Sequence, residues 1–163
     1  MKSTQKKSKL YPPSKELASK VSEYATEYIP VRKTGFRDFI YSDIDVLDLI
    51  KKGISKKALD NTLEMMGISL EEMSDILHVS ERTLRRYTDT SLLNTKQSER
   101  ILELTKLYHY GEEVFGNLET FKTWMDSTIM ALGEKRPKEF LDTSIGIKLI
   151  TNILGRIEYG VYS

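Results

Sequence analysis

From Asp43 to the C-terminus, apolar residues recur every three or four positions, which is the spacing of helices that bury one face. Residues that start and end helices divide this pattern into segments. Ser55, Ser69, Asn94 and Asn117 can cap helix N-termini, and Gly67 and Gly116 can end the helices before them. The pattern therefore predicts an all-α fold, in which short helices precede a long helix that starts at Asn94.

Two short helical segments lie on either side of residue 80. Ser69 and Glu72 have the spacing of a capping box, which predicts a helix start at Ser69. The buried face of this helix is expected to hold Leu70, Met73, Ile76 and Leu77. A second helix is expected from Glu81, after the brief link formed by His78, Val79 and Ser80. Two helices joined by so short a link must cross at a steep angle, which is the helix-turn-helix arrangement.

The second helix of this motif carries the candidate DNA-binding residues. With Leu84 and Tyr87 turned inward, the outer face holds Arg82, Thr83, Arg85 and Arg86. Arginine can donate two hydrogen bonds to guanine in the major groove, and neighbouring cations neutralise phosphates. The alternative is a basic helix end that is only solvated. At the turn, His78 stands where many such motifs have glycine, so a left-handed backbone there would be strained.

The last helical segment, capped by Asp142 or Thr143 and ended by Gly160, is apolar on more than one side. One set of residues is Ile145, Leu149, Ile153 and Ile157, and a second set is Ile147, Ile150 and Leu154. A helix that is apolar nearly all round needs cover on both sides. Either it lies wholly within the core, or its own core covers one side and a partner protein covers the other. Periodicity does not choose between the two.

Composition narrows the class of protein. Hydrophobic residues make up 39% and charged residues 30%, the balance of a soluble globular protein. No apolar run reaches the roughly 20 residues that span a bilayer, and no secretory signal follows the N-terminal lysines. We therefore expect a cytoplasmic protein. The chain contains no cysteine, which excludes disulfides and thiolate metal sites.

The N-terminal region differs from the rest of the chain. Residues 1–20 carry six lysines and one glutamate, a net charge of +5, which leaves −4 for the remaining 143 residues. We expect a flexible basic tail that is solvated or contacts DNA phosphates. Residues 21–41 contain aromatic and aliphatic residues without one clean period. Residues 1–44 are thus predicted to be a tail and an irregular extension, with no assigned role.

No pattern of catalytic or metal-binding residues is evident. The two histidines, His78 and His109, are far apart, and no carboxylate spacing repeats a metal motif. Adjacent acids such as Glu71 and Glu72 point in different directions on a helix. Neither a phosphate-binding glycine loop nor a nucleophile elbow is present. We therefore expect a protein that is not an enzyme and that binds neither metal nor cofactor.

The end of the chain, residues 154–163, resembles the toxin-binding end of the Xre/ParS antitoxin family. Further matches are Phe115-Gly116, Trp124, Leu132-Gly133, Pro137, Leu141-Asp142-Thr143 and Gly146, and, upstream, Thr83-Leu84-Arg85-Arg86 and Ser98 with Arg100. The resemblance runs from about Asp45 to Ser163 and leaves the first 44 residues unexplained. The chain departs from the family after Trp124, where residues 126–130 lack an expected proline-containing loop.

The resemblance implies a type II antitoxin with an Xre-like helix-turn-helix domain at residues 45–108 and a toxin-binding domain at residues 109–163. The usual partner is a RES-domain toxin that degrades NAD; the antitoxin covers the active site of the toxin, and the complex represses its own promoter. Carried over to this chain, the toxin-binding residues are Leu154, Gly155, Arg156, Glu158, Tyr159, Gly160, Val161 and Tyr162. A homodimer or a larger complex with the toxin is expected.

A second interpretation is a stand-alone helix-turn-helix transcription regulator whose C-terminal domain only dimerises. A helix-turn-helix module needs a dimer to address two half-sites one helical turn apart, so this interpretation is coherent. A toxin gene beside the gene for this chain would favour the antitoxin, and its absence would favour the regulator.

Overall fold

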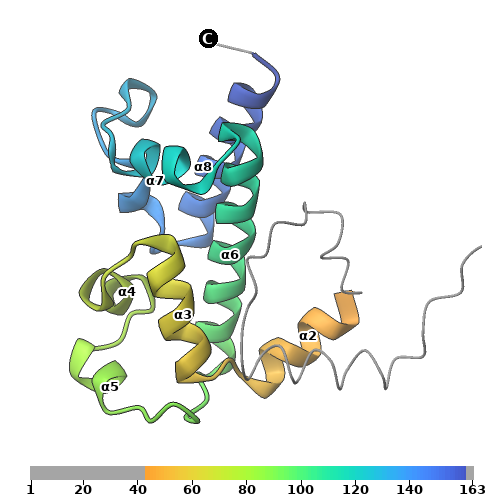
Figure 1. The fold of residues 1–163 in the computed structure, drawn as a ribbon, viewed down its shortest axis with the longest axis vertical. Coiled ribbons are helices and arrows are strands. Elements are labelled where there is room, and N and C mark those ends of the chain that lie inside the picture. The colour runs from red at the N-terminus through yellow and green to blue at the C-terminus, as the bar shows by residue number, and fades with distance from the viewer. Residues whose placement is uncertain (1–42, 161–163) are drawn as a thin grey trace, which may run out of the picture.

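The computed structural model of this protein describes residues 43–160, drawn as the coloured ribbon in Figure 1. The elements are α2 (Asp43–Lys52), α3 (Lys56–Met66), α4 (Leu70–Ile76), α5 (Glu81–Arg85), α6 (Thr95–Phe115), α7 (Leu118–Asp126), the 3-10 helices η2 (Met130–Leu132) and η3 (Pro137–Phe140), and α8 (Ser144–Glu158). Pairing of strand type within residues 43–160 is limited to isolated bridges, Ser55 with Leu92 and Ile129 with Lys135. The predicted all-α fold is confirmed for this part of the chain. None of its helices is both long enough and apolar enough to traverse a bilayer.

Several predictions from the sequence fall outside the described residues. These are the basic tail and most of the irregular extension, residues 1–42, and the last two candidate toxin-binding residues, Val161 and Tyr162.

The helices start where the sequence predicted, because side chains satisfy backbone N–H groups that have no partner within the helix. Ser55, Ser69, Asn94 and Asn117 each accept a hydrogen bond from a backbone N–H of the first turn. Glu72 and Gln97 complete capping boxes with Ser69 and Asn94. Of the two candidate caps for the last helix, Thr143 caps α8.

The long helix α6 is the axis of the fold. In Figure 1, α3 lies beside one half of α6, with α4 and α5 beyond it, and α7 and α8 lie beside the other half. Ile101 and Leu104 of α6 are fully buried in a hydrophobic core whose members run from Ile54 to Leu154. The predicted domain boundary between residues 108 and 109 falls inside α6, so the two predicted domains share one helix and one core.

Phe121 of α7 packs at the centre of the C-terminal half. Its ring is fully buried, meets Tyr108 edge-on with the ring centroids 5.2 Å apart, and stacks on Trp124 at 5.9 Å. A Cβ atom added at Gly111 of α6 would lie 2.4 Å from the Phe121 ring. Glycine at this position therefore allows α7 to approach α6 closely, so that these two helices pack together in the C-terminal half of the fold.

Candidate DNA- and toxin-binding surfaces

The predicted helix-turn-helix consists of α4 and α5. Ser80 caps α5, since its Oγ accepts a hydrogen bond from the backbone N of Thr83 at 3.2 Å. Leu84 has no exposed surface and anchors α5 to the core. The four candidate DNA-binding residues, Arg82, Thr83, Arg85 and Arg86, are all exposed. They lie on the outer side of the module, where a groove of DNA would be accessible to them.

Arg85 already has a partner on its own helix. Its Nε lies 2.9 Å from Oε1 of Glu81, and Nη2 contacts the same oxygen. The Arg85 side chain is 65% exposed, so solvent screens this ion pair and its contribution to stability is small. A DNA phosphate would have to compete with Glu81 for Arg85, which sets Arg85 apart from Arg82 and Arg86 as a candidate contact.

The turn between α4 and α5 has a left-handed backbone at His78, the conformation expected from the sequence to be strained for a residue other than glycine. His78 has a φ of +54°, a conformation that costs an L-residue free energy relative to glycine. Its imidazole Nε2 lies 3.0 Å from the carbonyl oxygen of Asp142. Because a carbonyl only accepts, Nε2 must carry the proton and donate it. The side chain that strains the turn also ties it to the residue before the cap of α8.

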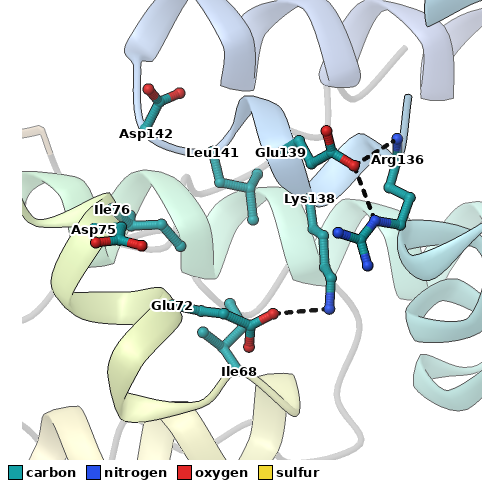
Figure 2. Close-up of a pocket in the computed structure, with 9 residues that line it drawn as sticks. All are labelled: Ile68, Glu72, Asp75, Ile76, Arg136, Lys138, Glu139, Leu141 and Asp142. Carbon is teal, nitrogen blue, oxygen red and sulfur yellow. Dashed lines mark hydrogen bonds and ion pairs between the residues drawn. The ribbon is translucent and has the colours of Figure 1, made fainter. Parts of the chain in front are cut away.

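Lys138 in η3 makes a second connection between the helix-turn-helix and the C-terminal helices. Its Nζ lies 2.8 Å from Glu72 Oε1 in α4 (Figure 2) and 2.5 Å from Asp126 Oδ1 at the end of α7. Burial alone would raise the pKa of Glu72, but hydrogen bonds from Lys138 and Ser69 outweigh burial and hold that pKa below its ordinary value. Hydrogen bonds to Asp126 and Glu72 hold the pKa of Lys138 above its ordinary value.

A groove of about 310 Å³ lies between α4 and η3 (Figure 2). Its lining residues are Ile68, Glu72, Asp75, Ile76, Arg136, Lys138, Glu139, Leu141 and Asp142. Both cations of the groove are paired, Lys138 with Glu72 and Arg136 with Glu139 at 2.9 Å. Among residues 43–160, no three His, Cys, Asp or Glu side chains are grouped so that they could hold a metal ion. The Lys138–Glu72 pair links η3 to α4, whereas the Arg136–Glu139 pair lies within the η3 segment.

The helix α8 presents one buried and one exposed apolar side. Ile147, Ile150 and Leu154 are buried against the core. Ile145 is 84% exposed and Leu149 is 39% exposed, although both are large and apolar. The sequence left open whether this helix lies wholly within the core. In the structure it does not, and its outer side is available to a partner.

The candidate toxin-binding residues on α8 do not all lie on that outer side. Arg156, Glu158, Tyr159 and Gly160 are exposed, Gly155 is half-buried, and Tyr159 has 78% of its surface exposed. Leu154 is a correction to the sequence-based set, because it is fully buried and has no surface that a toxin could contact. The core covers Leu154 because it belongs to the same face of the helix as Ile147 and Ile150.

Tyr110 of α6 is a residue that the sequence did not single out. Its hydroxyl donates a hydrogen bond to Glu158 Oε2 at 2.6 Å, which ties the end of α8 to α6. This bond, followed by desolvation and the charge of Glu158, raises the pKa of Tyr110 to about 12. The two residues are 48 positions apart, so no local pattern signals their contact.

Comparison with known proteins assigns the class. Residues 45–106 match the family model of the antitoxin Xre-like helix-turn-helix domain. Residues 111–160 match that of the antitoxin Xre/MbcA/ParS C-terminal toxin-binding domain. Together the two matches cover most of the chain, and the protein belongs to the Xre/MbcA/ParS family of antitoxins. It is therefore an antitoxin of a toxin–antitoxin system, and residues 45–106 form its helix-turn-helix domain, a fold typical of DNA-binding proteins.

Individual relatives are more distant. The chain is 29% identical over 120 residues to an antitoxin Xre of Yersinia enterocolitica, an alignment that covers 72% of this chain and 81% of that protein. It is 26% identical over 132 residues to the Prs ADP-ribosylating antitoxin of a Sphingobium species, covering 75% and 83%. A chain of the M. tuberculosis MbcT–MbcA toxin–antitoxin complex is similar with a TM-score of 0.47 and 18% identity, covering 64% of this chain and 94% of that one.

Proposed function

We propose that this antitoxin binds and neutralises a RES-domain toxin that degrades NAD, by covering the active site of the toxin with the end of α8. The observation that carries the proposal is the exposed side of α8 within the toxin-binding domain of the family. Ile145, Leu149, Arg156 and Tyr159 follow one another at helical spacing along this side. The chain itself contributes no catalysis.

The chemistry at the end of α8 suits a site that binds NAD. An arginine can donate two hydrogen bonds to an acceptor such as a carboxylate in the pocket, and a tyrosine ring can occupy the place of an aromatic base, without either side chain being turned over. Arg156 and Tyr159 supply these two groups, and both are exposed. Val161 and Tyr162 would extend the same contact. The acting surface is thus the end of α8, and the exposed apolar side chains Ile145 and Leu149 continue the outer side toward the start of the helix.

The name of the Sphingobium relative points to a second possible NAD-consuming reaction, since ADP-ribosyl transfer also uses NAD. The test is to co-express the chain with the protein encoded by the neighbouring gene, co-purify the complex, and follow NAD loss with and without the antitoxin. We expect a stable complex and suppressed NAD loss. Transfer of ADP-ribose to a protein acceptor would place the toxin in the second class. A neighbouring protein that forms no complex would contradict the proposed neutralisation of that protein and favour a protein that acts as a stand-alone regulator.

A truncation separates the end of α8 from the rest of the fold. Removing residues 155–163 leaves Leu154, the last fully buried residue of α8, in place. This variant should fold and should lose neutralisation. Removing only residues 161–163 keeps all of α8 and should weaken neutralisation only by the contacts that Val161 and Tyr162 add. If the chain without residues 155–163 still protects cells from the toxin, the end of α8 is not the inhibitory element.

We further propose that the antitoxin acts in the cytoplasm as a homodimer, or as a larger complex with the toxin, and represses its own operon. Arg82, Thr83 and Arg86 on the exposed side of α5 would contact the operator. The support is the match of this half to a helix-turn-helix domain together with the exposure of these side chains. Binding of the promoter region upstream of the operon, measured at several salt concentrations, tests it.

A further inference from the structure

Tyr110 lies in the short stretch of α6 between the two family-matched ranges, which end at residue 106 and resume at residue 111. We propose that Tyr110 is a positioning residue for toxin binding: its hydrogen bond to Glu158 orders the last turn of α8 before the toxin arrives. The inference rests on the proposed function, because it takes the end of α8 to be the toxin-binding element.

The last turn of α8 has few other anchors. Residues 155–160, the described residues after Leu154, are half-buried or exposed, and Ile157 is the half-buried one with an apolar side chain. Gly155 lowers the helix propensity of this turn. The carboxylate of Glu158 lies at the C-terminal end of the helix, where the helix dipole disfavours a negative charge. A helix end of this composition would fray without a contact to the rest of the fold.

Tyr110 supplies that contact. Its hydroxyl bonds Glu158 Oε2 at 2.6 Å, the short distance of a hydrogen bond to an ionised carboxylate. The same hydroxyl covers Gly155, since a Cβ atom added to Gly155 would lie 3.4 Å from the Tyr110 oxygen. One side chain of α6 therefore bonds residue 158 and lies next to residue 155, and these two positions are on the same side of the helix.

The consequence for binding is preorganisation. A segment that is ordered before it binds loses less conformational entropy on binding. Arg156 lies two residues before Glu158, Tyr159 directly follows it, and both are exposed. Fixing Glu158 on α6 therefore fixes the direction in which both side chains point. The geometry also gives Glu158 a role different from the one that the family resemblance implies. The carboxylate of Glu158 already accepts a hydrogen bond from Tyr110 within the antitoxin. Glu158 therefore acts by holding the end of α8 in place, and not as a direct contact to the toxin.

The experiment is a double-mutant cycle on toxin affinity, using the protein encoded by the neighbouring gene as the probe. Tyr110→Phe keeps the ring and removes the hydroxyl, and Glu158→Ala removes its acceptor. We expect each variant to bind about fivefold to tenfold more weakly than wild type. The double variant should bind no more weakly than either single variant, because both remove the same bond. Glu158→Gln keeps an acceptor and should recover part of the affinity.

Tyr87→Phe is the matched control. It removes the hydroxyl of a half-buried tyrosine in the helix-turn-helix half, and it should bind the toxin as wild type does.

A second readout needs no toxin. In the free antitoxin, the backbone N of Tyr159 donates to the carbonyl of Gly155 and that of Gly160 donates to the carbonyl of Ile157. Hydrogen exchange at these two amides should speed up in Tyr110→Phe, while amides around Ile150 keep their protection.

Unchanged exchange at the amides of residues 159 and 160 would overturn the inference. Faster exchange with wild-type toxin affinity would overturn it as well. If wild-type antitoxin fails to bind the neighbouring protein, the proposed function fails, and the exchange data alone then decide whether Tyr110 orders this turn.

Discussion

The imidazole of His78 donates a hydrogen bond to the carbonyl oxygen of Asp142 across a distance of 3.0 Å and a separation of 64 residues. His78 forms the turn of the helix-turn-helix, and Asp142 precedes Thr143, the residue that caps α8. The helix-turn-helix and α8 are therefore joined at the turn of one and the start of the other. The strained backbone of His78 is part of this connection, since a glycine would relieve the strain and lose the bond.

The two contributions of His78 can be measured separately. His78→Ala loses the hydrogen bond and keeps the strained backbone, whereas His78→Gly loses the bond and relieves the strain. We expect the alanine variant to be less stable than the glycine variant by about 1 kcal/mol in chemical denaturation. Equal stability of the two variants would mean that the turn is not left-handed in solution.

Three glycines within helices should respond differently to alanine. At Gly111 the added Cβ would lie 2.4 Å from the buried Phe121 ring, and at Gly146 it would lie 1.9 Å from the carbonyl oxygen of Phe140. We expect each of these variants to lose about 1–3 kcal/mol of stability through overpacking. At Gly155 the nearest atom is the Tyr110 hydroxyl at 3.4 Å, so Gly155→Ala should be neutral or up to about 1 kcal/mol more stable.

Thermal or chemical unfolding of the three variants measures their stabilities and checks that Gly155→Ala is the most stable of the three. A clear loss of stability in Gly155→Ala would show that the last turn of α8 packs more tightly than the structure has it. If Gly155→Ala keeps its stability and yet fails to bind the toxin, the requirement for glycine comes from the close approach of the toxin and not from the antitoxin fold.

The Lys138 bridge makes stability depend on pH at both ends of the range. The folded protein holds the pKa of Glu72 below its ordinary value, so this contribution is present above about pH 4.3 and is lost as the pH falls through the lowered pKa. The folded protein holds the pKa of Lys138 above its ordinary value, so this contribution is present below about pH 10.4 and is lost as the pH rises through the raised pKa.

Lys138→Met keeps the length of the side chain and removes its charge. At neutral pH we expect a loss of about 0.5–1 kcal/mol, as for partly exposed ion pairs. The acid side of the stability profile should become flatter, because Glu72 keeps only its bonds to Ser69. Lys106→Met, at an exposed position on α6, is the control and should leave the profile unchanged. An identical pH profile in wild type and Lys138→Met would rule out the bridge in solution.

The arginines of α5 should differ in their effect on DNA affinity. Replacing Arg82 or Arg86 with alanine should weaken operator binding and lower the slope of log affinity against log salt by about 1 for each lost phosphate contact. Arg85→Ala should have a smaller effect, because Arg85 is engaged by Glu81. Arg136→Ala, on the far side of the groove beside α4, serves as the control. Affinity and salt slope that stay unchanged in Arg82→Ala and Arg86→Ala would refute a direct DNA contact.

Local sequence patterns determined the order and the ends of the helices. Capping by Ser55, Ser69 and Asn94 joins residues three positions apart, so the cap and its partner can be recognised together in the sequence. The same holds for the outward direction of Arg82 and Arg86, which follows from the period of the helix once Leu84 is placed inward. The family resemblance likewise depended on short motifs that stay contiguous in the chain.

Only the tertiary structure decided which side of α8 is buried, because isoleucine and leucine occupy both sides and periodicity cannot rank them. Packing against α6 buries Ile150 and Leu154 and leaves Ile145 exposed, which removes Leu154 from the surface that a toxin can reach. The bonds from Tyr110 to Glu158 and from His78 to Asp142 join residues 48 and 64 positions apart. Their geometry depends on how whole helices pack, and that information is spread over the entire core and not held in any local pattern.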